Sequence, residues 1–130
     1  MIRENLNLLS PNLSTTISPH LMKISEIKFK ITLDENNLPE NISWEADDAG
    51  VKGIKNCKSF MISMWDSADT GTLRIDLWTK KMPVDEMQRF FYETFMSMAD
   101  TYQRATNEKV HADLIREFAT SLGKKINVLN

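Results

Sequence analysis

The chain has 130 residues, of which 16 are basic and 18 acidic, so its formal net charge is −2 at neutral pH. The basic residues stand in small groups and form no long stripe, which disfavours binding to a nucleic-acid backbone. No run approaches the ~20 apolar residues that span a bilayer, so we expect no direct membrane insertion.

The single cysteine, Cys57, has no second thiol for an intramolecular disulfide, which fits a reducing compartment. Polar residues interrupt the N-terminal leucines before a signal-peptide core forms. We therefore expect a cytoplasmic protein. Residues 1–21 are rich in Ser, Thr, Asn and Pro and predict a disordered tail or a mis-assigned start, with Met22 as a second start. Residues 22–130 are predicted to form a single domain.

The first patterned segment, from Glu26 to Asp34, alternates strictly between apolar and polar residues. Turn-forming residues fill 34–40, and the alternation resumes through Ile42, Trp44 and Ala46. This pattern predicts an antiparallel hairpin with a loop of several residues.

The next segment, 47–58, contains two glycines and is predicted to be an irregular connection. Residues 59–66 are apolar on both faces, which is typical of a central strand. After a turn at 67–71, residues 72–79 alternate again and complete a second hairpin. The apolar face of this last strand carries Leu73, Ile75 and Leu77, and the polar face carries Arg74, Asp76 and Trp78.

Two helices are expected at the C-terminal end. Pro83 suits the first position of a long amphipathic helix whose apolar stripe contains Val84, Met87, Phe91, Phe95, Met98 and Tyr102. Asn107 is expected to cap a second helix, and Gly123 to end it. The fold class is therefore α+β in the order ββββαα, with a four-stranded antiparallel sheet of two hairpins covered on one face by the two helices.

Few residues suggest catalysis. His20 lies in the predicted tail, and His111 is either a general base or metal ligand or a boundary residue that packs on one side. No second ligand accompanies His111 at helical spacing, so packing is favoured. Cys57 lies near two lysines but has no histidine in its segment, and Asp47-Asp48 matches no calcium loop. We predict no enzymatic activity, metal or cofactor.

Partner binding is the more plausible use of the remaining features. Trp78 shares a predicted polar face with Arg74 and Asp76, where it either shields backbone or anchors a partner. Tyr92 and Met96 lie off the main stripe of the first helix, either under the second helix or in an interface. The expected partners are other proteins, including a second copy of the chain.

Several segments resemble one known family. They are Met22–Phe29, Leu33–Glu40, Trp65-Asp66, Thr72–Lys80, Met82–Met87 and Ser97–Tyr102, and together they look like the gliding-motility protein family GldC. The resemblance runs from Met22 to about Phe118, and Leu73–Met87 is its most specific part. Residues 1–21 lie outside it.

The resemblance implies a cytoplasmic accessory protein of bacterial gliding motility, in machinery coupled to the type IX secretion apparatus. It implies no catalytic residues. One alternative is a small-ligand-binding protein with a pocket between sheet and helices, lined by Trp44, Met64, Met87 and Phe91. Another is a secretion chaperone whose methionine-rich faces bind unfolded chains.

Overall fold

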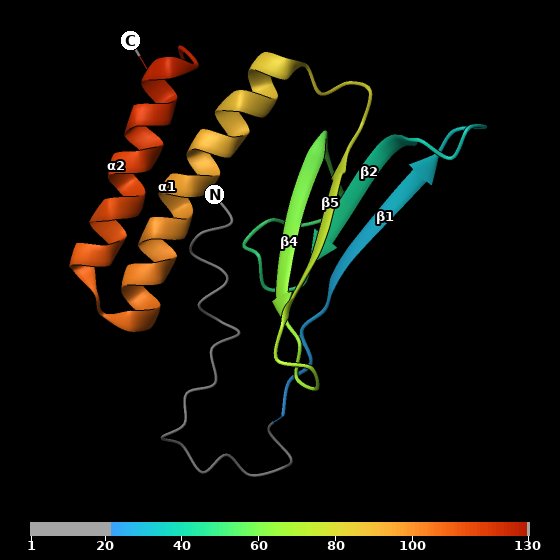
Figure 1. Ribbon diagram of the computed structural model, residues 1–130. Helices are drawn as coiled ribbons and strands as arrows, with labels where there is room; N and C mark the ends of the chain where they lie inside the picture. Colours follow the sequence, from blue (N-terminus) through green and yellow to red (C-terminus); the bar gives the residue numbers. More distant parts are fainter. Residues whose placement is uncertain (1–21, 130) are drawn as a thin grey trace. The chain divides into compact units, whose positions relative to one another are not determined.

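The computed structural model describes residues 22–129, in which strands precede two helices (Figure 1). The strands are β1 (Ile27–Leu33), β2 (Pro39–Ala46), β3 (Lys55–Cys57), β4 (Ser59–Trp65) and β5 (Thr72–Trp78). The helices are α1 (Val84–Thr106) and α2 (Lys109–Lys125). The predicted α+β class, with both helices after the strands, is confirmed. The predictions for residues 1–21, including His20, lie outside the described residues.

The chain divides into two compact units, which we call the strand unit, up to Lys81, and the helical unit, from Met82. The predictions that residues 22–130 form one domain and that the helices cover a sheet face stay predictions.

The prediction of one four-stranded sheet is wrong, because the strands form a three-stranded sheet, β1-β2-β3, and a two-stranded sheet, β4-β5. The additional strand, β3, lies in the segment 47–58 that the sequence predicts to be irregular. It pairs antiparallel with β2, so that Cys57 stands opposite Ile42. Only Lys58 separates β3 from β4, and the chain changes sheets at this residue. In the described residues, β4 is thus not a central strand but has β5 as its one strand neighbour.

The β1–β2 hairpin is closed at both ends by an aspartate. At the turn, the Asp34 carboxylate accepts hydrogen bonds from the backbone N–H groups of Asn36 and Leu38, at 2.8 and 3.0 Å. Lys80 donates a third bond to the same carboxylate. At the open end, the Asp47 carboxylate accepts the N–H of Glu26, while its own N–H donates to the Glu26 carbonyl. These bonds close the predicted hairpin at its turn and at its open end.

The β4–β5 hairpin repeats the same chemistry at its turn. The Asp66 carboxylate accepts the N–H groups of Ala68 and Asp69, and its N–H donates to the Gly71 carbonyl. These two backbone donors hold the pKa of Asp66 below its ordinary value. Short polar side chains that bond their own backbone are what define such turns.

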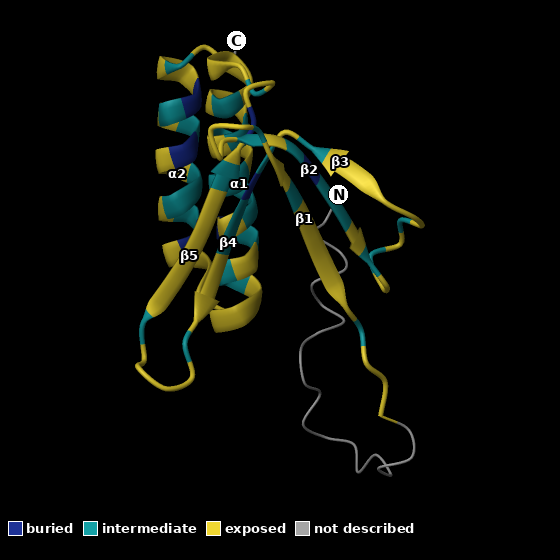
Figure 2. Cartoon of the chain, turned by 90° about the vertical axis from the view of Figure 1, so that its right-hand side faces the viewer, coloured by how far each residue is buried: buried dark blue, intermediate teal, exposed yellow. Residues whose placement is uncertain are grey.

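Burial in the strand unit is concentrated where the two sheets meet. Ile42 of β2 has no exposed surface, and Phe60 of β4 is buried with its ring 4.7 Å from that of Phe29 in β1. Figure 2 shows that much of the remaining strand surface is exposed. The sheets therefore share a small core, and large apolar side chains remain at the surface of this unit.

The first helix begins at Val84, one residue after the predicted first position, and the boundary between the two helices also differs from the prediction. Pro83 is the N-cap of α1, and Asp85 and Glu86 occupy its first turn, where the helix dipole favours negative charge. Asn107 does not cap α2; it ends α1 in the left-handed conformation, with φ of 60°, and donates its N–H to Gln103. An asparagine tolerates this conformation better than most residues.

Small residues form the contact between α1 and α2. The buried residues of the described helices are Ala99 in α1 and Ala112, Ala119 and Gly123 in α2. Gly123 does not end α2, which continues to Lys125. An added Cβ at Gly123 would stand 2.9 Å from the ring of Tyr92, so this glycine is where α1 approaches closely.

Candidate functional site

The strongest candidate surface is the polar face of the β4–β5 sheet. The register sets Ser63 opposite Arg74, Met61 opposite Asp76 and Ser59 opposite Trp78. Because directly opposite residues share a face, all three predicted residues of β5 lie on one side of the sheet. The structure thus brings together Arg74, Asp76 and Trp78.

The two charged side chains of this face form an ion pair. The Arg74 guanidinium donates to both carboxylate oxygens of Asp76, at 2.9 and 3.3 Å, and to the Ser63 hydroxyl at 2.9 Å. Both charged side chains are about half exposed, so water screens the pair and its contribution to stability is small. The cluster fixes the direction of the guanidinium and leaves it accessible.

Two tryptophans stand at opposite ends of the same face. Trp78 is 60% exposed, and Trp65, which pairs with Thr72, is 71% exposed. The sequence pattern assigns Trp65 to a central strand and does not predict that it lies on this face. The signal for it lay in the hairpin register, which places Trp65 on the face of Trp78 as soon as the turn at 66–71 is fixed.

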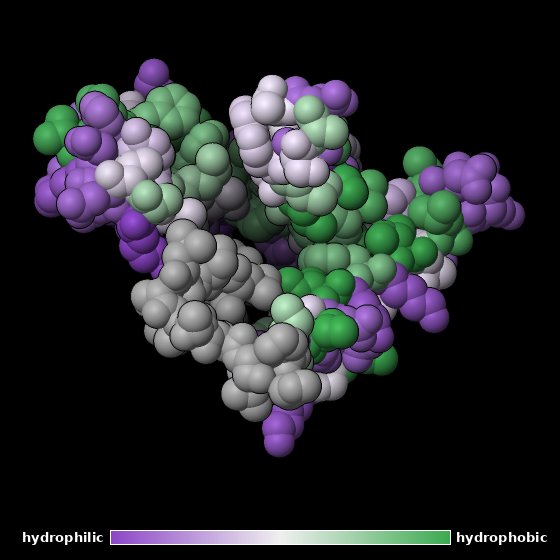
Figure 3. Space-filling model, turned by 90° about the horizontal axis from the view of Figure 1, so that it is seen from below, coloured by the Kyte–Doolittle hydropathy of each residue, from purple (hydrophilic) through white to green (hydrophobic). Residues whose placement is uncertain are grey.

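The reverse face of the β4–β5 sheet is entirely apolar. It carries Leu73, Ile75 and Leu77 from β5 and Phe60, Ile62 and Met64 from β4. Phe60 is buried, but Leu73, Ile75 and Met64 are exposed. Figure 3 shows hydrophobic surface gathered beside polar surface on the part of the chain that holds the strands. This sheet therefore presents a polar, aromatic face and an apolar face that is only partly covered.

Tyr92 and Met96 lie in the other unit. The Tyr92 ring packs on Gly123 of α2, so the second helix covers it, which is one of the two predicted alternatives. Both side chains are half-buried. Their role in binding a partner stays a prediction.

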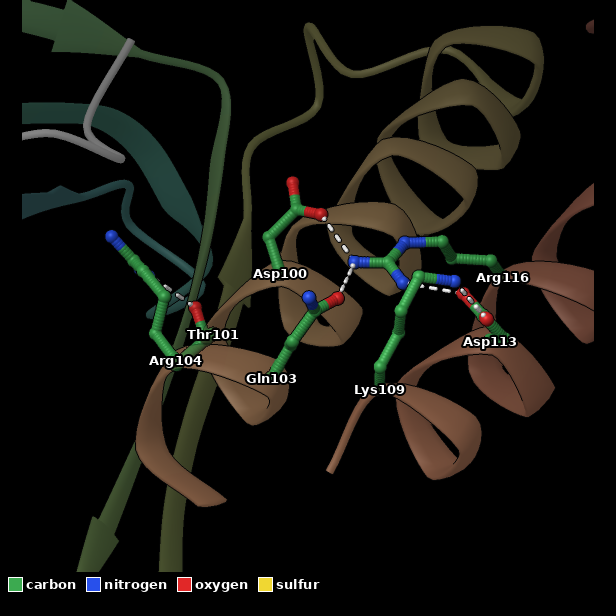
Figure 4. Close-up of polar contacts among 7 residues, drawn as sticks. All are labelled: Asp100, Thr101, Gln103, Arg104, Lys109, Asp113 and Arg116. Carbon is green, nitrogen blue, oxygen red and sulfur yellow. Dashed lines mark hydrogen bonds and ion pairs between the residues drawn. The ribbon is translucent and has the colours of Figure 1, made fainter. Parts of the chain in front are cut away.

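The polar side chains of the helical unit form a cluster between the two helices (Figure 4). Arg116 of α2 donates to Asp100 at 3.0 Å and to Gln103 at 2.8 Å, both in α1, and to Asp113 at 2.7 Å. Lys109 donates to the other oxygen of Asp113. The hydrogen bond from Lys109, followed by that from Arg116, holds the pKa of Asp113 below its ordinary value. These bonds link α2 to α1 and give Arg116 three acceptors.

The two candidate nucleophilic or basic groups have ordinary surroundings. His111 is exposed, and its Nδ1 lies 3.2 Å from the Tyr102 hydroxyl. Cys57 is half-buried on the apolar side of the β1-β2-β3 sheet, opposite Ile42, and burial raises the pKa of its thiol. A raised pKa lowers the fraction of thiolate, which is the reactive form.

Among the remaining candidates for ion or ligand binding, one carboxylate is engaged in the β1–β2 hairpin. The Asp47 carboxylate of the Asp47-Asp48 pair accepts the Glu26 N–H, as described above. Among residues 22–129, no three side chains of His, Cys, Asp or Glu form a group that would hold a metal ion. An open depression is lined only by residues of α2, from Asp113 to Lys124. The ligand pocket predicted around Trp44, Met64, Met87 and Phe91 stays a prediction.

None of the helices in the described part of the chain is long and apolar enough to cross a membrane. One family model, described as "Gliding motility-associated protein GldC-like", matches residues 39–128. That range is more than half of the chain and includes Leu73–Met87, the most specific part of the resemblance; residues 22–38 lie outside it. Comparison with curated proteins and with solved structures finds no match.

Proposed function

Because the chain belongs to the gliding motility-associated GldC-like family, we propose that it is a non-enzymatic accessory protein of gliding motility that works by binding another protein. The proposal locates it in the cytoplasm, next to the motility and type IX secretion machinery. The observation that carries the proposal is the exposed Trp78 beside the Arg74–Asp76 pair on the polar face of the β4–β5 sheet.

This face has the composition of a binding hot spot. Trp and Arg contribute most of the free energy in many protein interfaces, because each combines a large contact area with a directed donor. The backbone of Trp78 is already ordered in the β4–β5 ladder, so binding does not have to order it. The Arg74 guanidinium is already oriented by Asp76 and Ser63, which lowers the entropic cost of meeting an acidic or carbonyl-rich partner surface.

Affinity purification from a gliding host tests the proposal. The bait is the tagged full chain, compared with Trp78→Ala, Arg74→Ala and the control Ile54→Ala, whose side chain is 70% exposed outside the strands. We expect the wild type and the control to capture the same few proteins. Each of the other two variants is expected to recover at least about tenfold less partner, as loss of a hot-spot residue predicts.

A genetic arm connects binding to motility. A host strain that lacks the gene is complemented with the wild type, with Trp78→Ala or with Ile54→Ala, and colony spreading is measured. Spreading restored equally by all three, together with unchanged capture by Trp78→Ala, would remove this face from the proposal. Capture of no specific protein by the wild type would contradict the function itself.

A second candidate function, a chaperone-like binder of unfolded chains, is favoured by one observation. Leu73, Ile75 and Met64 form an exposed apolar strip on the reverse face of the same sheet. Exposed apolar surface on a soluble domain is a common sign of protein binding. Such a binder would capture many unrelated chains and would depend on Ile75 more than on Trp78, so the same purification separates the two functions when Ile75→Ser is included.

A further inference from the structure

The outer edge of β5 is a hydrogen-bonding surface. In the described residues the β4-β5 sheet has two strands, so β5 has a strand neighbour on one side only. Its residues are exposed, apart from the half-buried Leu77 (Figure 2). A strand edge of this kind is a template for pairing with another strand.

The ladder with β4 determines which backbone groups face the open edge. The Gly71 carbonyl accepts from Asp66, and the Thr79 N–H donates to Lys58, so the bonds to β4 come from odd-numbered residues of β5. In an antiparallel ladder every second residue bonds to a given neighbour. The N–H and C=O groups that point away from β4 are therefore those of Thr72, Arg74, Asp76 and Trp78.

The charges on β5 select one way of pairing this edge with itself. To form hydrogen bonds, a second β5 must place its own outward N–H and C=O groups opposite those of the first. The possible registers therefore differ from one another by shifts of two residues. The register centred on Ile75 overlaps the full strand and sets Arg74 opposite Asp76 of the second copy, twice by symmetry. The neighbouring registers set Arg74 opposite Arg74, or Asp76 opposite Asp76. Like charges directly opposite are destabilising, whereas opposite charges stabilise.

The same register also joins the apolar face of one copy to the apolar face of the other, and polar face to polar face. A two-fold axis midway between the two Ile75 residues sets Leu73 opposite Leu77 of the second copy and continues the apolar face across four strands. On the polar face, Trp78 lies opposite Thr72 and diagonal to Arg74 of the second copy, within reach of stacking on its guanidinium. An isologous pair of this kind closes on itself and leaves no further β5 edge.

β1, one of the two edge strands of the other sheet, gives the opposite result. Its centred register would place Lys30 directly against Lys30 of a second copy, and lysines are a common device that blocks edge pairing. Of these two edge strands, β1 thus has a centre that repels a second copy of itself, whereas β5 has a centre that is complementary to a second copy.

We propose that β5 pairs antiparallel with β5 of a second copy of this chain, with the two-fold axis midway between the two Ile75 residues and Arg74 opposite Asp76 in both directions. This pairing goes beyond the proposed function, because the edge pairs whether or not the polar face also binds another protein. A four-stranded sheet with two copies of the Trp78 face would then meet the motility partner twice, which raises avidity.

Sedimentation velocity on the purified full chain tests the pairing with a charge-exchange series. We expect the wild type to be a dimer at micromolar concentration. Arg74→Asp alone puts carboxylates at both positions, and Asp76→Arg alone puts cations at both, so each variant is expected to be a monomer. An equimolar mixture of the two is expected to form a heterodimer, and the double variant, Arg74→Asp with Asp76→Arg, a homodimer.

Each result decides the proposal. Recovery of the dimer in the mixture and in the double variant supports the β5 register. A wild type that stays monomeric at the highest concentration, single variants that dimerise like the wild type, or a mixture that stays monomeric would overturn it. A monomer that still captures the motility partner leaves the proposed function standing, and a dimer that captures nothing leaves the pairing standing.

Amide hydrogen exchange on the wild type supplies a second measurement, which needs no substitution. In the dimer the outward amides of Arg74 and Asp76 become hydrogen-bonded, so their exchange should slow by about tenfold or more as concentration rises. The Ile75 amide, which bonds to β4, serves as the internal control and should change little. Exchange at Arg74 and Asp76 that is independent of concentration in a dimeric sample would show that the dimer uses another surface.

Discussion

The strand unit and the helical unit are held together in different ways. The two β hairpins are closed by backbone ladders and by aspartates that bond the turn, so their side chains remain free to form surfaces. The α1–α2 pair is closed by positions with a minimal side chain, where α1 and α2 approach most closely. Side-chain changes should therefore be tolerated on much of the strand surface and poorly tolerated along the helix contact.

The largest expected effect is in the small core of the strand unit, where changes of side chain should not be tolerated. Ile42→Ala removes a fully buried side chain and is expected to lower the free energy of unfolding by about 2–4 kcal/mol, because it leaves a cavity. Chemical denaturation measures the change. The control, Ile54→Ala, removes a largely exposed side chain and should change stability by less than about 0.5 kcal/mol. Equal effects would mean that Ile42 is not the centre of the core.

The next effect tests the close approach of the helices. Gly123→Ala places a methyl group 2.9 Å from the Tyr92 ring, and overpacking of this kind costs about 1–3 kcal/mol, of which roughly 1 kcal/mol is offset by the better helix propensity of alanine. We expect a net loss of stability in thermal denaturation.

Gly71→Ala is the matched control, because an added Cβ at Gly71 would have no neighbour closer than 4.0 Å. Combining Gly123→Ala with Tyr92→Ala should remove the clash with the ring and leave only the contact with Leu129 Cδ1 at 3.0 Å, so the two substitutions should be less than additive. A stabilising Gly123→Ala variant would show that the helices separate easily at this point.

A smaller effect tests the turn chemistry of the strand unit. The hydrogen bond from Lys80, followed by the Leu38 N–H, lowers the pKa of Asp34 from 3.8 to about 2. A carboxyl group whose pKa is lower in the folded than in the unfolded state stabilises the fold at any pH above the unfolded pKa. This stabilisation is lost as the pH falls from about 4 to about 2. Titration followed by NMR should give a low midpoint in the wild type and a higher one in Lys80→Gln. A midpoint at the ordinary value in the wild type would contradict the bond.

The smallest expected effect on stability is at the candidate binding face. Trp78→Ala removes an exposed side chain from a strand whose ladder does not depend on it, so the free energy of unfolding should change by about 0.5 kcal/mol or less. The same variant is expected to lose partner capture. A loss of more than about 2 kcal/mol would identify Trp78 as a structural residue and weaken the proposed function.

Some of this protein could be predicted from the sequence alone. Both hairpins, the two helices and the grouping of Arg74, Asp76 and Trp78 depend on alternation or periodicity between neighbours in the chain. Such patterns are local, so they can be interpreted without knowing which other strands or helices the segment packs against. The family resemblance is local in the same sense and is confirmed over residues 39–128.

The rest was decided by contacts between residues distant in sequence. The three residues of β3 carry no pattern and become a strand only because β2 offers them an edge, which also separates β4 from β2. Trp65 reaches the polar face only through its pairing with Thr72. Gly123 follows the rule for a helix end, yet α2 continues past it to Lys125, and the Tyr92 ring leaves no room for a Cβ at this position. Local preference sets which segments form strands and helices, whereas their partners and closest contacts depend on packing between distant residues.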